Sequence, residues 1–150
     1  DHGAKIYSGI PSEGFCLDRV VFSNNGIFVI ETQAVKKPEN RDAKIVFNGE
    51  SVLINGTVRT SNPIIQVKAE ASWLAEILFK ITGQKFDVKP IVVYSDWPIE
   101  TTNEGKISGI SVLNSKTLPK FIKKNKGQLS NEEVELISLH FTRYIRSTRG

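Results

Sequence analysis

The stretch that decides the fold runs from Phe15 to Gln33 and reads FCLDRVVF, SNNG and IFVIETQ in succession. Its two outer segments are rich in β-branched and aromatic residues, and the Ser-Asn-Asn-Gly sequence between them is typical of a tight β-hairpin. A two-residue loop at Asn24-Asn25 would pair Asp18 with Glu31, whereas a loop one residue later would pair Asp18 with Gln33. In either register we expect Asp18 to lie beside Glu31 on one face of adjacent strands, within about 8 Å.

Two carboxylates in such positions repel each other, and burying either one is costly. The residues that share their face (Val20, Phe22, Ile27 and Val29) are apolar, so water alone is a poor explanation for the pair. A divalent cation between the carboxylates would account for them, and oxygen ligands suit Mg²⁺ or Mn²⁺ better than zinc. The alternative is that both acids face solvent at a sheet edge or pair with Lys and Arg.

The rest of the chain alternates strand and helix signals, which predicts one α/β domain over residues 1–150. Asn62-Pro63 predicts the start of the longest helix, with Asn62 as N-cap, and Gly83 its end. Ser130 and Glu133 form a capping box that predicts the last helix. The other expected elements are strands at 4–8, 44–47, 51–54, 58–60, 88–94 and 107–113, a polar loop at 34–43 and a short basic helix at 118–124.

Composition narrows the class of protein. The 150 residues include one cysteine, Cys16, and two histidines, which argues against disulfides and zinc and favours a reducing compartment. No apolar run is long enough to span a bilayer. The chain lacks methionine, so we expect it to be a fragment that begins after the natural start.

Positive charge is concentrated near the C-terminus. Residues 1–115 carry 12 Lys and Arg against 13 Asp and Glu, whereas residues 116–150 carry 8 against 3. Such a segment, with Lys120, Lys123, Lys124 and Lys126, could follow a phosphate backbone or simply form a solvated helix face. We also expect Trp97 to line a rim, where it could stack on bases.

Several of these segments together resemble the nuclease-related domain (NERD) family, which belongs to the PD-(D/E)XK nuclease superfamily. The similar segments are Pro11–Phe15, Leu17–Val21, Asn25–Gln33, Asn62–Gln66, Lys89–Val93, Leu113–Ile122 and Arg143–Arg146. The resemblance implies a restriction-endonuclease-like fold, with a mixed central sheet flanked by helices. The family has an acidic residue on a helix before the first strand, so we expect that opening helix to be missing upstream of Asp1.

The resemblance also implies a role for individual residues. Asp18 matches the family's metal-binding aspartate, and Glu31 matches the acid of its Glu-x-Lys motif; together they would hold Mg²⁺ or Mn²⁺. Gln66 matches a helix glutamine that contacts the site or a phosphate. Gln33 stands where the family has its catalytic lysine, and we expect the nearby Lys36 and Lys37 to face solvent from a polar loop.

These roles imply a Mg²⁺-dependent nuclease domain that hydrolyses nucleic-acid phosphodiester bonds, with DNA as the expected substrate. The main alternative is a nucleic-acid-binding or partner-docking module that kept the fold and lost activity with the lysine. A third is a structural domain of a membrane-attached protein. We expect a bacterial cytoplasmic protein without membrane contact from this segment, although the missing upstream part leaves room for an anchor.

Overall fold

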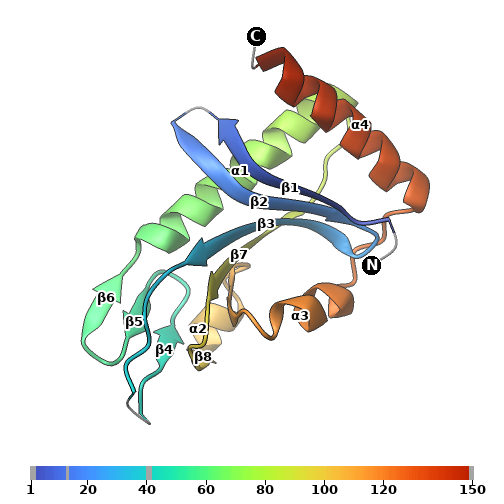
Figure 1. Ribbon diagram of the computed structural model, residues 1–150. Helices are drawn as coiled ribbons and strands as arrows, with labels where there is room; N and C mark the ends of the chain where they lie inside the picture. The colour runs from blue at the N-terminus through green and yellow to red at the C-terminus, as the bar shows by residue number, and fades with distance from the viewer. Residues whose placement is uncertain (1–2, 13, 40–41, 149–150) are drawn as a thin grey trace.

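The computed structural model describes residues 3–12, 14–39 and 42–148 (Figure 1). The strands are β1 (Lys5–Ser12), β2 (Phe15–Ser23), β3 (Gly26–Gln33), β4 (Ile45–Phe47), β5 (Val52–Ile54), β6 (Val58–Thr60), β7 (Val88–Tyr94), β8 (Ile99–Thr101) and β9 (Ser111–Asn114). The helices are α1 (Asn62–Thr82), α2 (Asn103–Lys106), α3 (Leu118–Lys124) and α4 (Asn131–Thr148). The expected mixed α/β class is therefore confirmed.

The larger sheet has the order β1-β2-β3-β7-β9. Its first three strands are antiparallel, and β3, β7 and β9 run parallel to one another. The parallel pairing of β3 with β7 requires a crossover, and α1 forms part of it on one face of the sheet (Figure 1). Helices thus flank a mixed sheet, as expected.

The two faces of this sheet have separate hydrophobic cores. Val20, Phe22 and Val29 pack in the same cluster as Leu74 of α1 and Phe141 of α4. The residues between them in the strands point to the other face, where Val21, Phe28, Ile30, Ile91 and Val93 cluster with Leu118 of α3. Because strand side chains alternate, Asp18 and Glu31 belong to the face that α1 covers.

A smaller sheet of order β6-β5-β4-β8 is formed by the chain between β3 and α1 together with β8. The expected strands at 44–47, 51–54 and 58–60 are confirmed as β4, β5 and β6. Strand β8 and helix α2 were not predicted, because each is only three or four residues long and β8 pairs with β4 from far along the chain.

Several predicted boundaries need correction. The first strand continues to Ser12, because it pairs with β2 along its whole length. The strand expected at 107–113 begins only at Ser111, and Ile107 is 87% exposed in the loop before it. Helix α1 has Ser61, not Asn62, as its N-cap, whereas Gly83 ends it in a left-handed conformation as predicted.

Other local predictions are confirmed. The Ser130 hydroxyl accepts a hydrogen bond from the Glu133 N–H, and the Glu133 carboxylate accepts one from the Ser130 N–H, which is the reciprocal pattern of a capping box. Across the described part of the chain, no helix combines the length and hydropathy that a bilayer crossing needs.

Candidate active site

The register of the β2–β3 hairpin decides which acids face each other. Residue pairs run from Ser23 opposite Gly26 to Arg19 opposite Ile30, so the loop consists of Asn24 and Asn25 alone. This is the first of the two predicted registers; the paired residues end at Arg19 and Ile30, and hydrogen bonds of the Asp18 and Glu31 side chains join the strands at the next position. The sequence-based prediction that these two carboxylates are neighbours is therefore confirmed.

At this position each carboxylate bonds to the backbone of the opposite strand. The Asp18 N–H donates to Glu31 Oε1 at 3.4 Å, and the Thr32 N–H donates to Asp18 Oδ2 at 3.0 Å. Both carboxylates are thus held in place by fixed donors of the sheet. Glu31 is only 7% exposed, whereas Asp18 is half-buried.

No Lys or Arg of the described residues forms a salt bridge with this pair. Lys5 pairs with Glu135 and Lys44 with Glu100, so neither lysine is bonded to Asp18 or Glu31. Arg19, the nearest cation in sequence, donates to Thr32 Oγ1 instead. The alternative in which a Lys or Arg pairs with the acids is wrong for the described residues, and burial of Glu31 excludes a wholly solvated pair.

A third acid, Glu70 of α1, lies next to them. It is 0% exposed, and Gln66 one turn earlier donates from Nε2 to Glu70 Oε2 at 3.0 Å. The pKa of Glu70 is raised from 4.5 to about 8, mainly by burial and also by its hydrogen bond to Glu31 and the charges of Glu31 and Asp18, while the Gln66 hydrogen bond works in the opposite direction. At neutral pH Glu70 therefore carries a proton and is neutral.

Glu70 is not among the site residues that the sequence predicts. A signal was present, because Glu70 lies between Val67 and Leu74 on the apolar stripe of α1, where a charged residue is out of place. Charged side chains are almost never fully buried without a reason. Recognising Glu70 as part of this site requires knowing that this stripe packs over the hairpin.

The donor set fits a hard divalent cation in part. The Asp18 and Glu31 carboxylates supply oxygen atoms that Mg²⁺ or Mn²⁺ prefers, whereas the protonated Glu70 carboxyl can donate a hydrogen bond to Glu31. However, no three His, Cys, Asp or Glu side chains of the described residues form a ready-made metal-binding group. Asp18 and Glu31 are the pair that a cation would share, and Glu70 stands beside them in its protonated form.

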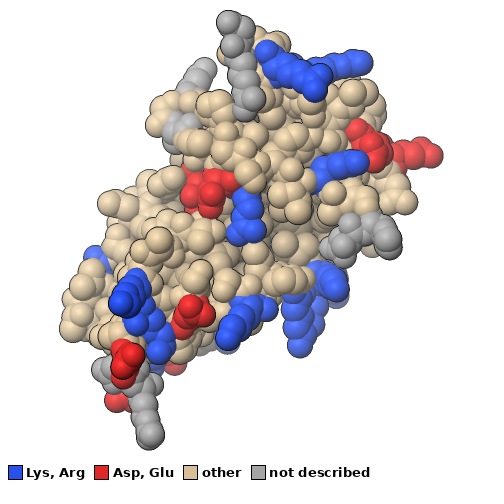
Figure 2. All heavy atoms as spheres, in the orientation of Figure 1, with Lys and Arg blue, Asp and Glu red and all other residues tan. Residues whose placement is uncertain are grey.

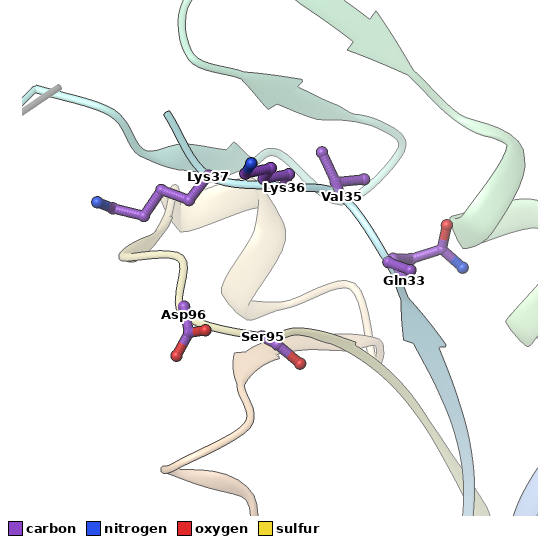
Figure 3. A pocket seen from close by; sticks show the side chains of 7 residues that line it. Gln33, Val35, Lys36, Lys37, Ser95 and Asp96 are labelled. Atoms are coloured by element: carbon purple, nitrogen blue, oxygen red, sulfur yellow. The ribbon is translucent and has the colours of Figure 1, made fainter. Parts of the chain in front are cut away.

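The two glutamines of the predicted site occupy different places. Gln66 is exposed except for its bond to Glu70, which links it to the carboxylates. Gln33 is half-buried two residues beyond Glu31 on the same strand face, and Figure 3 shows its side chain directed toward the start of α1. Hydrogen bonds thus join Asp18 to Glu31 and Gln66 to the neighbouring Glu70, whereas the Gln33 amide has no hydrogen bond within the described part of the chain.

Other predicted candidates lie elsewhere. Trp97 does not line a rim, because its ring is 1% exposed and its indole N–H donates to the Val35 carbonyl at 2.8 Å. The lysines of α3 lie on the helix that covers the opposite face of the sheet from the acids.

Comparison with known proteins gives one family match. The family model described as nuclease-related domain matches residues 1–95, a segment that contains Asp18, Glu31, Gln33, Gln66 and Glu70. No curated protein and no solved structure gave a significant match.

Proposed function

Since the chain belongs to the nuclease-related domain family, we propose that it is a metal-dependent nuclease that hydrolyses phosphodiester bonds of DNA on a restriction-endonuclease-like core. The observation that carries this proposal is the pair of carboxylates, Asp18 and Glu31, which the hairpin holds together and with which no Lys or Arg of the described residues forms a salt bridge. A protein retains such a costly arrangement where charge is needed for chemistry.

Asp18 and Glu31 are the residues that would hold Mg²⁺ or Mn²⁺. When bound, the ion supplies Lewis-acid polarisation of the phosphodiester and a more acidic water for in-line attack. The two backbone N–H groups fix the carboxylates before any ligand arrives, so little reorganisation is needed on binding.

The other residues shape the surroundings of this pair. Glu70 of α1 places a buried, protonated carboxyl group beside the pair on the side away from solvent. The hydrogen bond from Gln66 holds that carboxyl group in one orientation. The Gln33 amide can orient a water molecule or a phosphate oxygen beside Glu31. It carries no charge, so it stabilises a pentavalent phosphorane less than a lysine would.

The experiment that tests the proposal is nicking of supercoiled plasmid DNA by the purified chain. We expect nicking that requires Mg²⁺ or Mn²⁺ and stops in EDTA. Absence of nicking at any concentration of either ion would contradict the proposal, as would nicking that EDTA leaves unchanged.

A second candidate is a nucleic-acid-binding module with little or no catalysis, and Gln33 is the observation that favours it. This module would bind DNA with an affinity that falls steeply as salt rises, and it would do so without cleavage. The plasmid experiment separates it from the first proposal.

Replacing Gln33 with Lys is expected to raise the rate of metal-dependent nicking about 100-fold, since a single well-placed donor contributes roughly this much to the stability of a transition state. Gln33→Met, which is of similar length and uncharged, is the matched control and should leave the rate at or below that of the wild type. Equal rates in the two variants would show that the site does not lack a positive charge at this position.

A further inference from the structure

An open hollow of about 620 Å³ lies where the parallel strands β3 and β7 end. Its lining includes Gln33, Val35, Lys36, Lys37, Ser95 and Asp96, and Figure 3 shows the β3 extension on one side and the Ser95–Asp96 turn on the other. Ligands of α/β sheets bind preferentially at this end of the strands. The volume is within the range of small-molecule sites, and it is large enough for part of a nucleotide chain.

The two sides of the hollow are joined by a part-buried hydrogen bond, and a second one fixes the Trp97 backbone. The Trp97 indole donates to the Val35 carbonyl at 2.8 Å, which anchors the segment that carries Lys36 and Lys37. The Trp97 carbonyl in turn accepts a bond of 2.7 Å from the Asn114 amide at the end of β9. The hollow is therefore preorganised, which lowers the entropic cost of binding.

Two lysines, Lys36 and Lys37, line the hollow. Lys36 is exposed, as expected from the sequence, and Lys37 is half-buried. Within the described residues neither forms a salt bridge, and Lys37 Nζ reaches only the Pro38 carbonyl at 3.5 Å. Asp96 contributes a negative charge opposite them, so the lining carries a net charge of +1.

The hollow begins where the carboxylate pair ends. Gln33 lines it, and Gln33 follows Glu31 by two residues, or about 6.6 Å of extended strand. A polynucleotide strand that leaves the carboxylate pair along β3 would next meet Lys36 and Lys37. The lysines of α3 are separated from the pair by the sheet itself.

We propose that this hollow is a subsite for the DNA backbone next to the bond that is cleaved, with Lys36 and Lys37 contacting phosphates there. This inference rests on the proposed function, because it takes the Asp18–Glu31 pair as the place of cleavage.

The Asp96 carboxylate in the lining repels phosphate and therefore weakens its binding. Asp96 adopts a positive φ of 64°, which Asn tolerates as well as Asp, so its charge can be removed without changing the turn.

The test is fluorescence anisotropy of a labelled 20-bp duplex in EDTA, where no cleavage is expected, between 50 and 200 mM NaCl. The Lys36→Ala, Lys37→Ala double variant should bind about 10-fold more weakly, and its slope of log Kobs against log salt should be shallower by about 1.8, which is two phosphate contacts. Asp96→Asn should bind two- to fivefold more tightly, because it removes repulsion from the same site.

The matched control is the Lys80→Ala, Lys85→Ala double variant, which loses the same charge from the last turn of α1 and the loop just after it, about 30 Å from the start of that helix. Figure 2 shows further basic side chains along the lower edge of the drawn face, so a control for general charge is essential. This control should change affinity less than twofold.

The outcomes separate this inference from the proposed function. If the plasmid is nicked but both double variants bind alike, the hollow inference is wrong and the nuclease proposal stands. If binding depends on Lys36 and Lys37 but no metal-dependent nicking occurs, the hollow binds DNA in a non-catalytic module and the nuclease proposal is wrong. If the wild type neither nicks nor binds, both are overturned.

Discussion

Replacing Glu31 with Ala is expected to lower metal-dependent nicking by at least 100-fold. Glu31 supplies half of the proposed ligand pair, and a catalytic cation contributes several kcal/mol, of which each 1.36 kcal/mol is a factor of ten in rate. The fold should persist, because the change removes a charge from beside Asp18 and the buried Glu70. Initial rates with Mg²⁺ and Mn²⁺, together with circular dichroism of both proteins, provide the measurement.

Glu76→Ala is the matched control, since Glu76 is an exposed acid on α1 with no contact to the pair. It should nick at the wild-type rate. Equal activity of Glu31→Ala and Glu76→Ala, with identical purification, would show that the cleavage does not arise at the Asp18–Glu31 pair.

Stability in the absence of metal is expected to fall as pH rises, because of Glu70. Its pKa is raised from 4.5 to about 8 in the folded state by burial and by its acidic neighbours. Between these two values the unfolded chain has released this proton and the folded chain has kept it. The contribution is thus fully present below pH 4.5 and is lost at about 1.4 kcal/mol per pH unit as pH rises through 8.

From pH 5 to pH 9 this linkage amounts to a loss on the order of 4 kcal/mol in the free energy of unfolding. Urea denaturation in EDTA at several pH values measures it. Glu70→Gln keeps the size and hydrogen-bonding capacity of the protonated side chain, so its stability should be nearly constant over this range and should exceed that of the wild type at pH 9. Parallel curves for the two proteins would show that Glu70 ionises normally.

The hairpin and its acids could be predicted because both depend on local sequence. Asn24, Asn25 and Gly26 favour a two-residue turn, and the turn fixes the register that places Asp18 beside Glu31. The helix caps at Gly83 and Ser130 are local in the same sense. In each case the deciding residues are neighbours in the chain.

The rest of the site depends on contacts between distant segments. Glu70 joins the carboxylates only because α1 packs on that face of the sheet, and the hollow exists only because Trp97 bonds to Val35, 62 residues earlier. The prediction that Trp97 lines a rim was wrong for the same reason. Its neighbours Asp96 and Pro98 are typical of an exposed turn, whereas its ring is buried by contacts with distant segments. Sequence patterns do not encode such packing directly.

Calorimetric titration with Mn²⁺ tests the central claim most directly, because it asks whether the Asp18–Glu31 pair holds a divalent cation at all. We expect one binding site in the wild type, with an affinity at least tenfold lower in the Asp18→Asn, Glu31→Gln double variant. These substitutions preserve side-chain size and remove only the charged oxygens. Equal Mn²⁺ affinity in the two proteins, or no binding by the wild type, would contradict the assignment of this pair as the metal site.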